Sequence, residues 1–464
     1  MNNFINCDNL KRSFKSNHLY PWVVLGLVTI LLFISSSPKD PLSKVPGPWY
    51  ARWTDLISKY YWVRARKPLY IHDLHLKYGP IVRVGPREVY VCDPQAVQRV
   101  FRIKNEFPKS KWYLEFVPSV QSIFNTPDIA LHRRFRKLLS APLSESGLKA
   151  FLSQIDGKVN LTIQRMEEEY KTRGVTDIYK WWLFMTTDII GELSFGESFQ
   201  MLESGEINQY VIDLQNIGRM GSYRSVFPSL LKYSMRFGIP LPIINQARTF
   251  GMRMQKYATE LLNRHRNLVG SEGAQARPTV FTKVYKAEGD ESISLDEIRD
   301  NAQSYIVAGS DTTSNTLNFA TWSVCRNPEI QSRLVKELEA LPTDFTYEDL
   351  RHVPYLDHVI DEALRKFSAV PSGLPREVPE GGAELCGYHI PAGYTVTAQS
   401  YTLHRDPYAF PDPETYDPSR WENTTQAMKD VFMPFGGGSR GELPKLPAPL
   451  LKQFVSVQFR HTQY

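Results

Sequence analysis

One segment of the sequence places an acid beside two alcohols at a weak point of a helix. It reads Ala308-Gly309-Ser310-Asp311-Thr312-Thr313, in which only the alanine has a high helix propensity. A threonine hydroxyl can bond the carbonyl oxygen four residues earlier and bend the helix, which opens a local groove. An acid beside an alcohol in such a groove suits the relay of protons to a bound oxygen species. The alternative is a packing notch between two helices, and these residues alone leave both interpretations open.

Three further patterns could carry chemistry, although each is common on its own. Glu362 and Arg365 are three residues apart, which places a carboxylate and a guanidinium on one helix face. Residues 127–139 read as a short, very basic helix that contains His132 and Arg136, and this pattern alone favours a solvated basic face. An apolar approach at 431–434 leads into a glycine loop, Phe435-Gly-Gly-Gly-Ser-Arg440.

The acid–alcohol segment lies in the middle of the clearest helix of the chain. Ser294 and Glu297 form a capping box, in which each side chain satisfies a free backbone amide of the other residue. The helix continues to about Arg326, where Asn327-Pro328 ends it and begins the next one. At roughly 30 residues and near 45 Å, this helix is long enough to cross the whole molecule.

The other predicted elements are mainly helical, with two short hairpins. Residues 81–91 alternate apolar and polar side chains around Gly85-Pro86, and residues 387–398 show a similar pattern around Pro391-Ala-Gly393. Helices are predicted from Pro94 to Phe101, over 180–199 and over 233–267. Residues 404–421 form a meander interrupted by prolines, and 268–292 is the most loop-like region.

The N-terminal part suggests an anchor joined to a folded body. Residues 19–34 carry no charge, and with 35–37 they approach the length of a membrane helix, although a cleaved signal peptide is the competing interpretation. Residues 38–48 contain four prolines, which forbid helix and predict a stiff, extended hinge. The resulting division is a tail (1–18), a transmembrane anchor (19–37), a proline-rich hinge (38–48), a body (49–440) and a tail with several prolines (441–464).

Composition excludes several classes of protein. Hydrophobic residues make up 42% of the 464 residues and charged residues 22%, which excludes disordered, fibrous and disulfide-scaffold proteins. The net charge of +6 is too small over this length to indicate nucleic-acid binding. Four cysteines (Cys7, Cys92, Cys325, Cys386) show no zinc-binding spacing, and this usage fits a reduced compartment.

Taken in order, these motifs resemble the heme-thiolate cytochrome P-450 monooxygenases, specifically the membrane-anchored fungal type. The resemblance runs from the proline hinge to Arg440 and includes the 308–313 segment, Glu362-x-x-Arg365, Pro418-Ser-Arg420-Trp421 and Phe435-x-x-Gly438-x-Arg440. It implies a mainly α fold with small β-sheets, C-terminally incomplete here and preceded by one membrane helix. It also implies heme b and the insertion of one oxygen atom from O2 into a hydrophobic small molecule, with fungal secondary metabolism as the expected setting.

The resemblance assigns roles to individual residues. It makes Asp311 and Thr312 the catalytic acid–alcohol pair, and Glu362, Arg365 and Arg420 a buried structural triad. It replaces the solvated-face interpretation of 127–139 with contacts from His132 and Arg136 to a heme propionate. The other implied heme-binding residues are Arg376, Phe435, Gly438 and Arg440. Substrate-lining candidates are the 112–124 loop, Ser304, Tyr305 and 370–374, which together predict an apolar pocket.

The resemblance further implies an NADPH-cytochrome reductase as partner and a cytosolic body held on the endoplasmic reticulum membrane. The sequence departs from the family pattern at one decisive position, because the slot of the axial cysteine holds Glu442. Without the thiolate there is no electron push for O–O cleavage, so the chain as written is predicted to be inactive. A frameshift, a retained intron or altered splicing after Arg440 would explain the change. The alternatives are a non-catalytic membrane-bound remnant or scaffold and, third, a secreted or lumenal binding protein.

Overall fold

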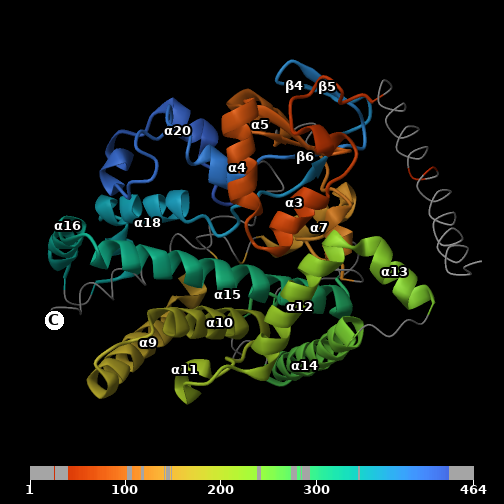
Figure 1. Cartoon of the computed structure of the whole chain (residues 1–464). Coiled ribbons are helices and arrows are strands. Elements are labelled where there is room, and N and C mark those ends of the chain that lie inside the picture. Colours follow the sequence, from red (N-terminus) through yellow and green to blue (C-terminus); the bar gives the residue numbers. More distant parts are fainter. Residues whose placement is uncertain are drawn as a thin grey trace, which may run out of the picture.

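A single long helix forms the axis of the computed structural model. This helix, α15 (Leu295–Cys325), begins with the predicted capping box, in which Glu297 N–H bonds Ser294 Oγ at 3.1 Å and Ser294 N–H bonds Glu297 Oε2 at 2.9 Å. It crosses the body between two groups of elements (Figure 1). Helices α9, α10, α11 and α14 lie on one side, and α18, α20 and the sheet with its helices lie on the other. The predicted central helix is therefore confirmed.

The structure describes residues 24, 26, 40–101, 107–116, 120–140, 142, 147, 149–237, 242–272, 279–282, 284, 293–342 and 345–437. The predicted anchor, the tail after 440, Gly438, Arg440 and Glu442 lie outside these residues. Among the described residues, no helix is both long and apolar enough to span a bilayer.

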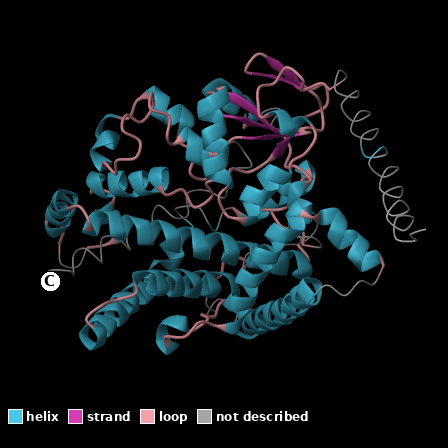
Figure 2. Ribbon diagram, in the orientation of Figure 1, coloured by secondary structure: helices cyan, strands magenta, loops and turns pink. Residues whose placement is uncertain are grey.

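Helices dominate the described residues (Figure 2). Before α15 the helical elements are η2 (Trp49–Arg52), α3 (Leu56–Val63), α4 (Lys67–Tyr78), α5 (Pro94–Val100), α6 (Trp112–Phe116), α7 (Ile129–Leu139), η4 (Lys149–Phe151), α9 (Leu152–Arg173), α10 (Ile178–Phe195), α11 (Met201–Ser204), α12 (Gln209–Val226), α13 (Pro228–Arg236) and α14 (Pro242–Glu272). After it come α16 (Pro328–Glu339), α17 (Tyr347–Leu350), α18 (Pro354–Lys366), α19 (Ser400–Leu403), η8 (Pro418–Asn423) and α20 (Gln426–Val431).

Helix α10 packs closely against the middle of α15. Thr186 Oγ1 donates a hydrogen bond to Ser310 O at 3.1 Å. A Cβ added to Gly309 would lie 3.2 Å from Ile190 Cγ1, so the two helices approach closely at this glycine. The packing-notch interpretation of the 308–313 segment is therefore correct for the face that α10 covers. It leaves the opposite face of the same segment to be considered.

The strands form one four-stranded and one two-stranded sheet. Strands β1 (Ile81–Gly85) and β2 (Glu88–Val91) make the predicted first hairpin, and the four-stranded order is β1-β2-β6-β3. Strand β3 (Arg376–Glu377) is antiparallel to β6 (Thr395–Thr397), which runs parallel to β2. The two-stranded sheet pairs β4 (Ala383–Leu385) with β5 (Tyr388–Ile390).

The predicted hairpin over 387–398 is wrong. Strand β5 turns back onto β4, whereas β6 belongs to the other sheet. The turn between β4 and β5 is Cys386-Gly387, and both residues have positive φ, at 50° and 78°. Two successive positive φ angles suit a tight hairpin, but cysteine is an unusual residue there, so the sequence conceals the turn.

The described part of the predicted hinge, residues 40–48, is folded, so the prediction of a stiff, extended spacer is wrong there. Residues 41–44 form turns, and Leu42 and Val45 are buried in the core beside the sheet. Arg83 N–H bonds Pro46 O at 2.8 Å, and the Arg83 guanidinium pairs with Asp40. High proline content excludes helix, but it does not distinguish an extended spacer from a series of turns.

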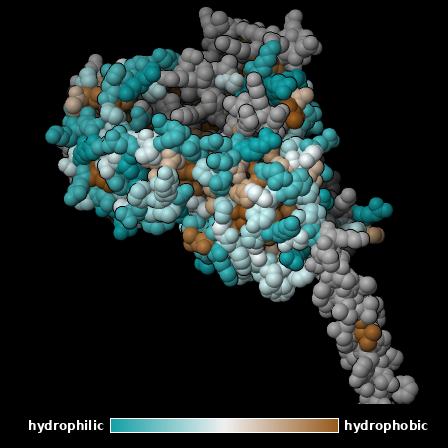
Figure 3. Space-filling view, turned by 90° about the horizontal axis from the view of Figure 1, so that it is seen from above, coloured by the Kyte–Doolittle hydropathy of each residue, from teal (hydrophilic) through white to brown (hydrophobic). Residues whose placement is uncertain are grey.

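Seen from above, the described surface of the body is mainly polar, with apolar residues scattered over it (Figure 3). Inside, one large apolar cluster joins α9, α10 and α14 to α15 and α18, and a second lies between the sheet, α5 and α20. An apolar pocket lies beside the second cluster. Phe101 and Ala398 belong to the cluster, Met433 packs against it, and all three line the pocket.

Candidate functional site

The predicted ion-pair triad is present and almost fully buried. Glu362 and Arg365, one turn apart on α18, have no exposed side-chain surface and form two hydrogen bonds of 2.8 Å. Arg420 Nε of η8 donates to Glu362 Oε1 at 3.1 Å, and Trp421 Nε1 donates to Oε2 at 3.0 Å. The backbone N–H of Asp417 adds a further bond to Glu362 at 2.9 Å. One carboxylate thus fixes α18 against the meander, as the structural role requires.

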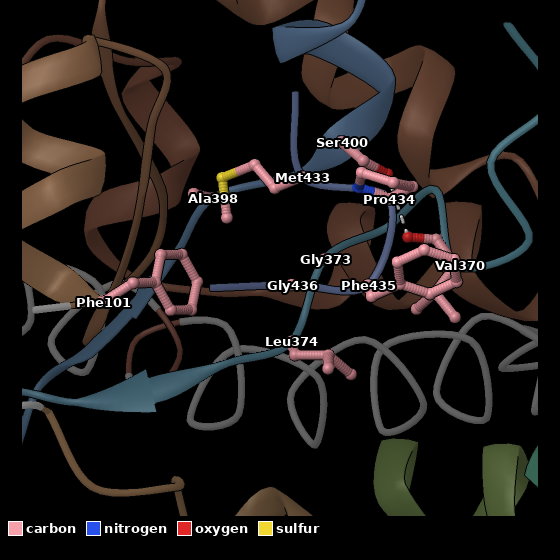
Figure 4. A pocket seen from close by; sticks show the side chains of 10 residues that line it. All are labelled: Phe101, Val370, Gly373, Leu374, Ala398, Ser400, Met433, Pro434, Phe435 and Gly436. Carbon is pink, nitrogen blue, oxygen red and sulfur yellow. Dashed lines mark hydrogen bonds between the residues drawn. The ribbon is translucent and has the colours of Figure 1, made fainter. Parts of the chain in front are cut away.

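An apolar pocket lies beside the start of the glycine loop (Figure 4). Its lining includes Phe435, which the sequence analysis selected. The residues that line it are Phe101, Val370, Gly373, Leu374, Ala398, Ser400, Met433, Pro434, Phe435 and Gly436. Gly436 has a φ of +75°, and a Cβ on Gly437 would lie 2.8 Å from Phe101 Cβ. The loop therefore needs glycine at these positions to approach the pocket wall.

The predicted cationic residues lie on two separate elements. Arg376, on β3, is 1% exposed, and its guanidinium lies 5.4 Å from the centre of the Phe101 ring, which lines the pocket. Arg376 therefore lies beside Phe101, which lines the pocket together with Phe435. His132 and Arg136 lie one turn apart on α7, whose N-terminus Asp128 caps. His132 is only 6% exposed, so the solvated-face interpretation is wrong for this residue.

The acid–alcohol pair lies in the middle of α15, directly after Ser310, whose carbonyl oxygen accepts a hydrogen bond from Thr186 of α10. Thr312 Oγ1 donates to the carbonyl of Ala308, the predicted back-bond, and its lone pairs stay available to accept another hydrogen bond. The Asp311 side chain reaches solvent, as does Val307 one turn earlier. Partial burial of the Asp311 carboxyl nevertheless raises its pKa above the usual aspartate range. A carboxyl with a raised pKa beside a hydroxyl can deliver and recover a proton.

A larger cavity of about 460 Å³ opens on the other side of Gly373, a residue that also lines the pocket. Its walls include Trp53, Trp62 and Trp112, and Trp62 meets Trp112 edge to face with ring centres 5.9 Å apart. The lysines of this wall are paired, Lys67 with Glu88 at 3.3 Å and Lys59 with Asp55 at 3.1 Å. The cavity therefore offers a ligand a mixed surface, in which Trp53, Trp62, Tyr90 and Trp112 supply aromatic patches among charged and hydroxyl side chains.

This cavity is lined by some of the predicted substrate-lining residues and not by others. Trp112 and Glu115, from the 112–124 loop, line it together with Ser372 and Gly373. Tyr305 does not, because its ring stacks on Phe281 in the core with ring centres 5.7 Å apart. The Ser304 hydroxyl bonds the carbonyl of Asp300 at 3.0 Å instead of facing the cavity. Because an α-helix turns by about 100° per residue, the adjacent residues Ser304 and Tyr305 point to different sides of α15.

Comparison with known proteins decides the family. The family profile described as Cytochrome P450 matches residues 48–441. The chain belongs to the cytochrome P450 family. The curated cytochrome P450 monooxygenase orf2 of Aspergillus niger is 40% identical over 420 residues, 90% of this chain and 84% of that protein. The cytochrome P450 monooxygenase tazI of Aspergillus terreus is 42% identical over 421 residues, 90% of this chain and 86% of that protein. The cytochrome P450 monooxygenase cypX of Dothistroma septosporum is 33% identical over 425 residues, 89% and 83% respectively.

Membership of the cytochrome P450 family implies a heme cofactor, and the described residues fit one. The pocket wall beside Phe435 and Gly436 is mainly apolar, which suits the apolar face of a macrocycle. The Arg376 guanidinium at the edge of this wall suits a carboxylate such as a heme propionate. Arg376 and Phe435 would hold the group from the described part of the site. His132 and Arg136 on α7 are the other described candidates.

Three residues that hold the loop before α7 were missed by sequence reasoning. Asp300 Oδ2 accepts from Gln121 N–H at 3.0 Å, and Asn301 Oδ1 accepts from Ile123 N–H at 2.9 Å. The ammonium of Lys109, 5% exposed, donates to the carbonyl of Ile123 at 2.8 Å. Together they fix the loop that precedes α7. The local sequence contains no signal for these roles, because asparagine and lysine in polar segments are normally solvated.

The described cysteines of this P450 do not supply a thiolate at the pocket. Cys92, Cys325 and Cys386 are free thiols outside the pocket lining. Burial raises the pKa of all three, to about 12 for Cys92 and about 11 for Cys386. A ligand to heme iron must be deprotonated, so these surroundings work against that role. This agrees with the interpretation of Cys325 and Cys386 as structural cysteines.

Proposed function

We propose that this P450 is a heme-dependent monooxygenase that inserts one oxygen atom from O2 into a hydrophobic small molecule in fungal secondary metabolism. The observation that carries the proposal is the Asp311–Thr312 pair in the middle of α15, where the Asp311 side chain reaches solvent and the Thr312 hydroxyl bonds back to Ala308. Relatives with the same extent along the chain carry the name monooxygenase, which supports the same reaction class. The three tryptophans in the wall of the 460 Å³ cavity, Trp53, Trp62 and Trp112, support a substrate with a hydrophobic part.

The residues of the chain have separable tasks in this proposal. Bound heme would supply the oxygen chemistry. Arg376 and His132, with Arg136, would hold its propionates, and Phe435 would pack against its face. Asp311 would hold a proton at its carboxyl and pass it on through the Thr312 hydroxyl, whose oxygen is fixed by the bond to Ala308. Burial raises the pKa of the Asp311 carboxyl above the usual aspartate range, which supports a role as a proton donor.

We also place the enzyme on the endoplasmic reticulum membrane with its body in the cytosol, where an NADPH-cytochrome reductase would supply electrons. The support is the uncharged 19–34 segment and the basic α7, on which Arg133 and Lys137 are exposed. A basic face attracts an acidic partner and speeds its association at low salt. Raising the ionic strength should therefore slow electron transfer from the reductase, and an unchanged rate would exclude docking at this face.

The residue at the axial-ligand position decides between two functions. Glu442 is a hard oxygen ligand in place of the soft thiolate, and this observation favours a non-catalytic membrane-bound remnant or scaffold as the second candidate. The first test is to sequence the gene and full-length transcript across Ser439–Gly441. A spliced frame with cysteine one residue after Arg440 supports the monooxygenase. If the gene and the transcript both encode Gly441-Glu442, the result supports the non-catalytic remnant.

The same question can be tested on protein. The chain as written and its Glu442→Cys variant would be expressed with reductase, and the reduced carbon monoxide complex would be recorded for each. A thiolate ligand shifts the Soret band to longer wavelength than an oxygen or nitrogen ligand does, so we expect this shift with cysteine alone. NADPH-dependent product formation by the chain as written would overturn the predicted inactivity.

A further inference from the structure

His404 links the ion-pair triad to the loop that lines the pocket, and no role has been assigned to it above. It follows α19 directly and has no exposed surface. Its ring lies between two aromatic side chains, with ring centres 5.3 Å from Phe432 and 6.5 Å from Phe410. A histidine held in this way has little freedom to rotate, so the direction of both ring nitrogens is fixed.

On one side, His404 and Arg365 hold each other through reciprocal hydrogen bonds. His404 Nδ1 lies 2.9 Å from the carbonyl oxygen of Arg365, to which it can only donate. In return, Arg365 Nη1 donates to the carbonyl oxygen of His404 at 2.9 Å. The same guanidinium holds Glu362, so the position of His404 is tied directly to the buried triad.

On the other side, His404 Nε2 accepts a hydrogen bond from the backbone N–H of Met433 at 3.1 Å. Because Nδ1 donates and Nε2 accepts, only the neutral ring satisfies both bonds. Burial, together with the nearby charges of Arg365 and Arg405, lowers the pKa of His404 to about 3. The neutral tautomer is therefore the stable one across the physiological range.

The bond to Met433 comes at the point where helix α20 no longer holds the chain. Phe432 N–H still bonds back to Met428 O at 2.9 Å, which closes the helix. Pro434 has no N–H, and Gly436 N–H bonds Met433 O at 3.2 Å within the loop itself. The Met433–His404 bond thus joins the start of the loop to the fixed triad, immediately before the pocket-lining residues Pro434 to Gly436.

We propose that His404 is a positioning residue that transmits the rigidity of the Glu362–Arg365–Arg420 triad to the loop Met433–Gly436 and so holds the loop in the heme-binding arrangement. The inference deepens the proposed function, since it assigns a cause to the shape of that site. It predicts that the acceptor at Nε2, rather than the volume of the ring, is what the loop requires.

Two substitutions separate these requirements on the full-length chain. In His404→Asn the side-chain amide can replace Nδ1 as the donor to Arg365 but does not reach Met433. In His404→Gln the longer side chain places an oxygen near the position of Nε2, where it can accept from Met433 N–H. His389→Asn is the control, because His389 is an exposed histidine in the two-stranded sheet. Circular dichroism would verify that each variant is folded.

The readouts are hydrogen exchange of the Met433 amide and titration with hemin. We expect exchange about tenfold faster in His404→Asn, the factor that corresponds to a lost hydrogen bond of about 1.4 kcal/mol, with weaker hemin binding. His404→Gln should restore most of both properties, and His389→Asn should change neither. Equal behaviour of the asparagine and glutamine variants would overturn the proposal, since it would show that only ring volume matters.

The wild-type chain provides an independent test that does not depend on the variants folding. The Met433 amide must be protected from exchange by an amount comparable to the triad helix α18, and free exchange there would overturn the proposal. Hydrogen exchange can be measured whether or not heme binds. If the Met433 amide is protected but the wild-type chain does not bind hemin, the result counts against the proposed function. The coupling of His404 to the loop would still be established.

Discussion

At the residue scale, Glu362 accepts hydrogen bonds from three side chains in the interior, Arg365, Arg420 and Trp421. Glu362→Gln would leave Arg365 as a buried cation without its charge partner, which costs about 3–5 kcal/mol of unfolding free energy. Urea unfolding followed by tryptophan fluorescence measures this loss. Arg333→Gln is the matched control, because Arg333 pairs with Glu422 at the surface and is worth less than about 1 kcal/mol. Equal losses in the two variants would contradict a special role for burial.

The protonation of His404 gives a second prediction at the same scale. Its pKa falls from 6.5 in the unfolded chain to about 3 in the folded one, so below pH 6.5 the unfolded chain binds a proton that the folded chain does not. The contribution of His404 to the free energy of unfolding is therefore complete above pH 6.5. It decreases by about 1.4 kcal/mol per pH unit as the pH falls toward 3. Urea midpoints at pH 7, 6 and 5 should converge between the wild type and His404→Gln as the pH falls. Parallel curves would show that His404 is not buried in its neutral form.

Single residues also show the limits of reading the sequence. The spacing of Glu362 and Arg365 predicts their contact because three residues along a helix always lie on one face. Spacing alone does not predict their burial, which only the family resemblance implied, and it does not predict the role of His404. Both depend on the meander folding back onto α18 over more than fifty residues of chain. Local propensity led to the 308–313 segment, where the structure shows the expected back-bond of Thr312, whereas Tyr305 packs on Phe281 in the core.

At the element scale, the first turns of α15 organise the loop that leads to α7. Asn301 accepts from Ile123 N–H and donates to Glu297 O at 2.8 Å, so it bonds both the loop and its own helix. Asn301→Leu keeps the shape but leaves the buried Ile123 amide without an acceptor. We expect a loss of about 1–3 kcal/mol in unfolding free energy and faster proteolysis within 120–126. Ser304→Ala, which removes only a bond within the helix, should change neither by more than about 0.5 kcal/mol.

Helices were predicted better than strands for a physical reason. Caps and breakers such as Ser294, Glu297 and Pro328 act through neighbours in the chain, and the structure confirms them. Strand pairing depends on distant partners, so β6 joins β2 across some three hundred residues, and local pattern suggested a hairpin with β5 instead. Glycine and asparagine are the usual residues at positive φ, and Cys386 at 50° broke that expectation.

At the scale of the whole molecule, the folded hinge makes the body begin at Asp40. The Asp40 carboxylate pairs with the buried Arg83 guanidinium and also accepts from Leu42 N–H at 3.2 Å, which closes the turn that buries Leu42. If residues 19–37 span a membrane as the sequence predicts, the folded turn leaves little free chain between the bilayer and the sheet. The body would then be held at a restricted orientation rather than on a long tether.

The hinge can be tested by limited trypsin digestion at Lys44, which is exposed within the turn. Asp40→Ala removes charge-assisted hydrogen bonds to Arg83, each worth about 1.5–3 kcal/mol, so the turn should open more often and cleavage after Lys44 should accelerate at least tenfold. Asp55→Ala is the control, because it removes a solvent-exposed pair with Lys59 and leaves the hinge intact. If cleavage at Lys44 is already fast in the wild type, the hinge is an open spacer. In that case the body would not be held at a restricted orientation, because only a turn bonded to β1 fixes the point at which the preceding residues join the body.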